Sequence, residues 1–232
     1  MEIHNMTLKT PFNMIISGAS GSGKTRKIVK LLKFRDIMLD KTTKKVYFFY
    51  SEWQDSYDIL RQLKLVHTFH KEVPSQDELI FMISDNDIES YNSKPHKLLI
   101  FDDLVSEIQD DLMAKLFTVF GHHKNGSTIL VTQALFNPRV NKFNILQENV
   151  HYLLFSKSPR DNSKVIYLAK QISPYNIRWV VQAYQNATKL PFAYLFMDFK
   201  QSTPENLRLR TQIFPDELPM KIYIPPKFDK SI

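Results

Sequence analysis

The chain has 232 residues and no cysteine, so we expect one sizeable core and exclude disulfide frameworks and thiolate metal sites. A hydrophobic content of 43% with only 5 glycines excludes disordered and collagen-like classes. The net charge of +7 is uneven: residues 1–45 hold 10 Lys or Arg against 3 Asp or Glu, residues 77–111 hold 2 against 10, and residues 112–232 hold 16 against 7. This pattern indicates either a basic surface that faces a polyanion or basic residues scattered over a solvated surface.

Strands and helices alternate along most of the chain. The strands are apolar throughout instead of alternating with polar residues, as a parallel sheet covered on both faces requires. We therefore predict an α/β fold with a mostly parallel central sheet flanked by helices. The expected strands are 13–17, 45–50, 97–101, 127–132, 151–155 and 192–199, and the expected helices are 25–39, 56–63, 111–120 and 177–185, with a polar stretch up to about residue 94.

No apolar run approaches the roughly 20 residues that span a bilayer, and the first twelve residues lack the apolar centre of a signal peptide. Four prolines after residue 214 indicate an extended tail. We expect a soluble, intracellular protein in which residues 1–232 form a single P-loop ATPase domain with a tail from about residue 215.

A complete phosphate-binding motif, GxxxxGK[ST], lies between the first strand and the first helix, which is the context that the motif requires. Its glycines let backbone N–H groups close around a phosphate, and the helix N-terminus adds partial positive charge. The lysine is expected to reach the β- and γ-phosphates of ATP, and the threonine to bind Mg²⁺. The motif consists of Gly18, Ala19, Ser20, Gly21, Ser22, Gly23, Lys24 and Thr25.

Two adjacent carboxylates, Asp102 and Asp103, end the third strand. The carboxyl ends of parallel strands meet at one edge of the sheet, where the phosphate loop also lies. We expect Asp102 to hold the magnesium ion and Asp103 to orient and deprotonate an attacking water. The alternative is an Asp-Asp pair that caps a following helix.

Two further polar residues follow strands at the same edge. Gln133 follows the fourth strand and is expected to sense the γ-phosphate or to position the water, unless it is an ordinary loop amide. Arg160 follows the fifth strand and is expected to stabilise transition-state charge, in its own subunit or across an interface; the alternative is a surface ion pair with Asp161. Other candidates for that role are Arg139, Arg208 and Arg210.

Two aromatic residues, Trp53 and Tyr57, follow the second strand. Either ring could stack on a nucleotide base. We favour the alternative that they lie in the core or in a subunit interface.

With these segments placed, the sequence resembles the genome-packaging ATPases of double-stranded DNA viruses and of Maverick/Polinton-type elements, within the FtsK/HerA superfamily. The resemblance runs from about residue 11 to 215. By position, Lys24 and Thr25 match the phosphate-loop pair of that family, Asp102 the metal carboxylate, Asp103 the catalytic acid and Gln133 the sensor. One departure is Asp103, where related motors commonly have glutamate. The matching segments are PFNMIISGASGSGKT, YSEWQ, KLLIFDDL, GHHKNGSTILVTQALF, SKSPRD and YQNATKLPFAYLFMDFKQSTPENLRLRTQIFP.

This resemblance implies a RecA-like core that works as a hexameric or pentameric ring. Such a ring hydrolyses ATP with Mg²⁺ and drives double-stranded DNA of any sequence into a preformed viral capsid, in the host cell where virions assemble. Two alternatives stay open: a P-loop kinase of a nucleotide or small metabolite, and a nucleotide-dependent switch in capsid assembly. Phosphate release without an acceptor distinguishes the ATPase from the kinase, and hydrolysis coupled to DNA distinguishes the motor from the switch.

Overall fold

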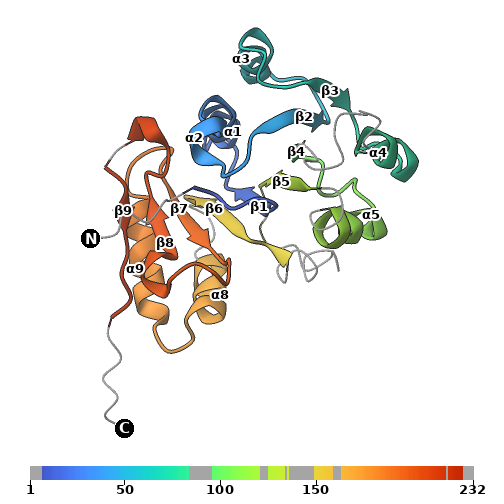
Figure 1. Ribbon diagram of the computed structural model, residues 1–232. Coiled ribbons are helices and arrows are strands. Elements are labelled where there is room, and N and C mark those ends of the chain that lie inside the picture. The colour runs from blue at the N-terminus through green and yellow to red at the C-terminus, as the bar shows by residue number, and fades with distance from the viewer. Residues whose placement is uncertain are drawn as a thin grey trace.

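The computed structural model describes residues 7–83, 96–120, 125–133, 135, 149–158, 163–217 and 219–226. One twisted sheet runs through the middle of the molecule, with helices packed on both of its faces (Figure 1). The predicted α/β fold with a mostly parallel sheet is confirmed. No helix in these ranges is long and apolar enough to cross a membrane.

Nine strands are paired in the order β3-β2-β4-β5-β1-β6-β7-β8-β9 within the described part of the chain. The pairs from β3 to β6 are parallel, whereas β7, β8 and β9 add an antiparallel extension. The phosphate-loop strand β1 therefore lies at the centre, between β5 and β6. The strands are β1 Asn13–Ser17, β2 Thr43–Tyr50, β3 Thr68–Lys71, β4 His96–Asp102, β5 Gly126–Thr132, β6 Tyr152–Ser156, β7 Tyr194–Asp198, β8 Leu209–Thr211 and β9 Lys221–Ile222.

Burial on both faces explains the continuous apolar sequence of the central strands. Every residue of β1, β4, β5, β6 and β7 is buried. Successive side chains of a strand point to opposite faces, so Ile15 packs into one core and Ile16 into the other. The sheet is thus enclosed between two hydrophobic layers. Because the strands are held on both faces, their ends have fixed positions.

One face is covered by α1, α2 and α3, and the other by α4, α5, α8 and α9, as the core contacts show. Helix α1 buries Ile28, Leu31 and Leu32 against the sheet, and α9 buries Val180 and Tyr184 on the opposite face. The helices are α1 Lys24–Lys33, α2 Arg35–Met38, α3 Asp58–Gln62, α4 Gln76–Ile83, α5 Asp110–Lys115, α8 Ser163–Ile172 and α9 Ile177–Ala187; shorter turns are η1 Asp55–Tyr57, η2 Leu116–Phe120 (a π-helical turn), η3 Glu205–Leu207 and η4 Pro215–Glu217.

Several expected boundaries were wrong. The helix expected over 25–39 is broken at Phe34, whose backbone leaves helical geometry (φ −104°, ψ 13°). The polar stretch before residue 94 contains β3 and α4, and α8 was not expected at all. Strand β3 is an edge strand that is only partly buried, so its sequence lacks the apolar run of the central strands.

At the amino ends of the strands, polar side chains join neighbouring strands within the core. Buried His96 lies 2.7 Å from the hydroxyl of Thr43 on β2 and 2.7 Å from the hydroxyl of Ser127 on β5. On the antiparallel side, Arg210 donates to Asp198 at 2.7 Å in a buried ion pair. These contacts stabilise the edge opposite to the phosphate loop.

Candidate nucleotide-binding site

The phosphate loop connects β1 to α1, and no other residue could replace Gly18, Gly21 or Gly23 without strain. A Cβ at Gly18 would lie 2.6 Å from the Ser22 hydroxyl and 2.7 Å from Ser156 Cβ. Gly23 has φ 78°, in the left-handed region that favours glycine, and it forms the N-cap of the ten-residue helix α1. The loop therefore directs the free N–H groups of that helix N-terminus toward any anion it encloses.

Lys24 lies across this loop. Its ammonium donates to the carbonyls of Gly18 at 3.0 Å and Ala19 at 3.2 Å. Burial lowers the pKa of Lys24, while the nearby charges of Asp102 and Asp103 oppose that shift. The same two carboxylates that were expected to act on the nucleotide thus lie within electrostatic range of this lysine.

Asp102 is buried at the end of β4 and is held by two hydroxyl groups. Tyr57 donates to Asp102 Oδ2 at 2.8 Å, and the hydroxyl of Thr25 also hydrogen-bonds to this carboxylate. Burial raises the pKa of Asp102, and the hydrogen bond from Tyr57 counteracts that rise. A hydroxyl and a carboxylate side by side fit Mg²⁺, which takes few protein ligands and completes its shell with water and phosphate oxygens.

The hydrogen bond from Tyr57 to Asp102 was not predicted from the sequence. It was expected in the core or an interface, and it is indeed buried, yet its hydroxyl reaches the expected metal carboxylate. The residue lies just after β2, and β2 pairs directly with β4. In the sequence, the position of Tyr57 after a strand was the only indication of this role. To infer the contact with Asp102 from it, one would also need to know that β2 and β4 are neighbours in the sheet.

Asp103 and Gln133 lie next to Asp102 on the solvent side. Asp103 is exposed and has φ 59°, a left-handed conformation that turns the chain at the end of β4. The side-chain amide of Gln133 donates to Asp103 Oδ2 at 3.4 Å. The structure therefore brings the second carboxylate and the expected sensor together, beside the phosphate loop.

The candidate arginines separate into two groups. Arg160 and Arg139 lie outside the described residues. Arg208 donates to the backbone carbonyls of Asp198 and Lys200, and Arg210 is buried against the Asp198 carboxylate. Both of these guanidinium groups are held at the amino edge of the sheet, opposite to the phosphate loop.

The model of the Poxvirus A32 protein family matches residues 3–172, which is more than half of the chain. The chain belongs to this family. A curated relative, the DNA packaging protein OPG160 of Variola virus, is 28% identical over 169 residues, which cover 68% of this chain and 58% of that protein. The chain thus spans somewhat more than half the length of this relative. The resemblance to viral DNA-packaging ATPases is confirmed.

Solved structures show that this chain shares its fold with P-loop ATPases. EssC (ATPases 2 and 3) from Geobacillus thermodenitrificans superposes with a TM-score of 0.53 at 15% identity, over 94% of this chain and 40% of that chain. The genome packaging NTPase B204 from Sulfolobus turreted icosahedral virus 2, in complex with ATP-gammaS, superposes with a TM-score of 0.50 at 15% identity. That match covers 92% of this chain and 97% of B204.

Proposed function

We propose that this chain is an ATP-hydrolysing motor that drives double-stranded viral DNA into a preformed capsid. The observation that carries the proposal is the meeting of Lys24, Thr25, Asp102, Asp103 and Gln133 at one edge of the sheet. A poxvirus relative that is named a DNA packaging protein supports the assignment to packaging. The motor acts as a ring of identical subunits in the host cell, where virions assemble.

Each residue has a distinct role in this proposal. The loop amides and Lys24 bind the β- and γ-phosphates, and Thr25 and Asp102 hold Mg²⁺, which when bound neutralises phosphate charge. Asp103 accepts a proton from the attacking water, and Gln133 orients that water. A kinase transfers the phosphoryl group to a substrate hydroxyl and excludes water, so it has no need for a carboxylate that activates water.

Tyr57 is proposed as a positioning residue for Asp102. In the variant Tyr57→Phe the ring keeps its packing but the carboxylate loses its donor, so we expect the Mg²⁺ concentration needed for half-maximal nucleotide hydrolysis to rise about 3- to 10-fold. The rate at saturating Mg²⁺ should change less than threefold. A Mg²⁺ titration at fixed ATP measures both quantities, and an unchanged midpoint would contradict this role.

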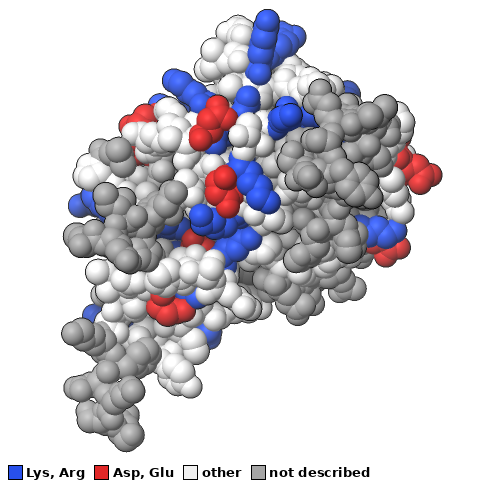
Figure 2. Space-filling view, in the orientation of Figure 1, with Lys and Arg blue, Asp and Glu red and all other residues white. Residues whose placement is uncertain are grey.

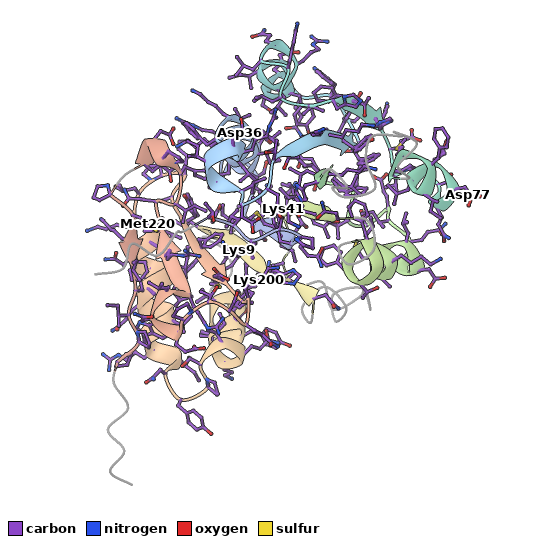
Figure 3. The ribbon with its side chains drawn as sticks, in the orientation of Figure 1. Lys9, Asp36, Lys41, Asp77, Lys200 and Met220 are labelled. Carbon is purple, nitrogen blue, oxygen red and sulfur yellow. The ribbon has the colours of Figure 1, made fainter. Side chains whose placement is uncertain are left out.

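Basic residues offer a surface for DNA at the edge opposite to the nucleotide. Lys9 and Lys41 precede β1 and β2, and Lys200 follows β7, so all three lie at the amino ends of the parallel strands (Figure 3). In Figure 2, Lys and Arg side chains lie over the middle of this face, with Asp and Glu between them. A translocase must pass over every sequence, so contacts of this kind with phosphates suit it better than contacts with bases.

The experiment that tests the function is ATP hydrolysis by the assembled oligomer, with and without duplex DNA of random sequence. We expect DNA to stimulate hydrolysis severalfold at low salt. The logarithm of DNA affinity should fall linearly with the logarithm of salt concentration, because phosphate contacts release counterions. An intact ring that hydrolyses ATP at the same rate with and without DNA would contradict the motor and favour the assembly switch.

A further inference from the structure

Beside the phosphate loop, the chain makes a tight turn with an aromatic residue in an unusual backbone conformation. The N–H of Ala193 donates to the carbonyl of Leu190, Pro191 occupies the second place of the turn, and Phe192 occupies the third with φ 61°. Glycine or asparagine ordinarily takes such a place, because a bulky side chain crowds the backbone there. Phe192 is nevertheless present and 57% exposed. Strain of this kind is concentrated at functional sites.

A cavity of about 260 Å³ lies between this turn and helix α1. Arg26 and Lys30 line it from α1, Tyr194 lines it from the start of β7, and Gly23 and Phe192 lie where it adjoins the phosphate loop. A Cβ at Gly23 would be only 3.3 Å from Phe192 Cδ1, so the phenyl ring lies directly against the last glycine of the loop. The cavity is close to the ~300 Å³ at which small-molecule sites begin, enough for one heterocycle.

Gln212 contributes a polar group to the same cavity. It too has a left-handed backbone, with φ 58°. Its side-chain carbonyl is buried and has no hydrogen-bond partner among the described residues. A buried acceptor without a donor is uncommon and asks for an explanation. A donor on a molecule bound in this cavity would give the carbonyl a partner.

The order of the strands gives the direction in which a nucleotide lies. Asp102 and Asp103 end β4, on the β5 side of the phosphate loop, so the γ-phosphate points toward β4. The nucleoside end of the nucleotide then points toward β6 and β7, on the opposite side of β1. The cavity beside Phe192 lies on that side, since Tyr194 begins β7.

We propose that this cavity binds the nucleoside part of a nucleoside triphosphate, with the base stacked on Phe192 and an amino group of the base donating to Gln212 Oε1. The inference rests on the proposed function, in which the phosphate loop binds the triphosphate. It adds a binding site for the nucleoside, the part that distinguishes ATP from inorganic triphosphate. Every base has a π-face, so the aromatic ring contributes affinity, and the amide adds a directional contact.

The test compares binding of ATP and of inorganic tripolyphosphate, each with Mg²⁺, to the full chain by isothermal titration calorimetry. The variant Phe192→Gly suits the left-handed turn, so the fold should be kept or stabilised. We expect ATP to bind about 5- to 100-fold more weakly, as for loss of one base-aromatic stack, while tripolyphosphate affinity stays unchanged. Phe81→Ala, at an exposed phenylalanine on α4, is the matched control and should change neither affinity.

A second variant changes a residue of the cavity other than Phe192, so the packing of the phenyl ring against Gly23 is kept. Gln212→Leu keeps the size of the side chain and removes the amide, so ATP affinity should fall about two- to tenfold and tripolyphosphate affinity should not. Unchanged ATP affinity in both variants would overturn the inference. So would an equal loss for both ligands, because Phe192 would then act only by shaping the loop. If ATP binds through its base but is not hydrolysed, the result contradicts the proposed motor and supports the nucleoside site. If neither ATP nor tripolyphosphate binds, the result contradicts both proposals.

Discussion

Replacing Lys24 by alanine should lower the rate of ATP hydrolysis at least about 100-fold while leaving the protein folded. The expectation follows from the position of the ammonium, which lies in the loop and donates only to the carbonyls of Gly18 and Ala19 among the contacts described. Removing a cation that stabilises charge in the transition state typically costs two to three orders of magnitude in rate. Phosphate release under saturating ATP measures the effect.

Lys33→Ala is the matched control for this experiment. Lys33 lies on the same helix, but it is exposed and points over the ring of Phe34 instead of into the loop. The two variants should have similar melting temperatures, because neither side chain packs in the core, and only Lys24→Ala should lose hydrolysis. Undiminished turnover in Lys24→Ala would rule out the ATPase.

The second large effect is expected for Asp103→Asn, which should bind Mg²⁺ and ATP but hydrolyse ATP about 10²- to 10⁴-fold more slowly. Asparagine is the suitable replacement because it tolerates the left-handed backbone of Asp103 (φ 59°) and keeps the size of the side chain. It also retains an oxygen that Gln133 can donate to. What it loses is the ability to accept a proton from water. Single-turnover hydrolysis, measured beside nucleotide affinity, separates the two effects.

Asp102→Asn gives the contrasting result. Because Asp102 is buried against Thr25 and Tyr57, its replacement should weaken Mg²⁺-dependent binding of ATP itself. If instead Asp103→Asn loses Mg²⁺-dependent binding and Asp102→Asn retains it, the roles of the two carboxylates are exchanged.

Local sequence signals were enough to predict the phosphate loop and the central strands. The loop is a short contiguous motif whose glycines are required by backbone geometry, and residues 13–17 form β1 as expected. A strand buried on both faces must be apolar throughout, so β4, β5 and β6 were also placed to within one residue. Parallel strands that end at one edge then bring Asp102 and Asp103 to the loop.

The remaining contacts depend on tertiary structure. Tyr57 reaches Asp102 only because β2 and β4 are neighbours in the sheet, and no spacing in the sequence encodes that pairing. Likewise, Phe192 and Gln212 face α1 because the antiparallel strands β7 and β8 fold back beside β6. Arg208 and Arg210 were candidates for stabilising transition-state charge by residue type alone. Only the fold shows that both have partners at the edge of the sheet opposite to the phosphate loop.

The antiparallel extension has a practical consequence for anyone who expresses a part of this protein. The family match ends at residue 172, before β7, yet all five residues of β7 are buried and pair with β6. A fragment cut at that point would leave β6 with a bare row of backbone N–H and C=O groups beside uncovered apolar side chains, which invites pairing between copies and aggregation. Glu217 bonds both Lys30 on α1 and the hydroxyl of Tyr194. A soluble fragment should therefore extend beyond Glu217 and include β9, which pairs with β8.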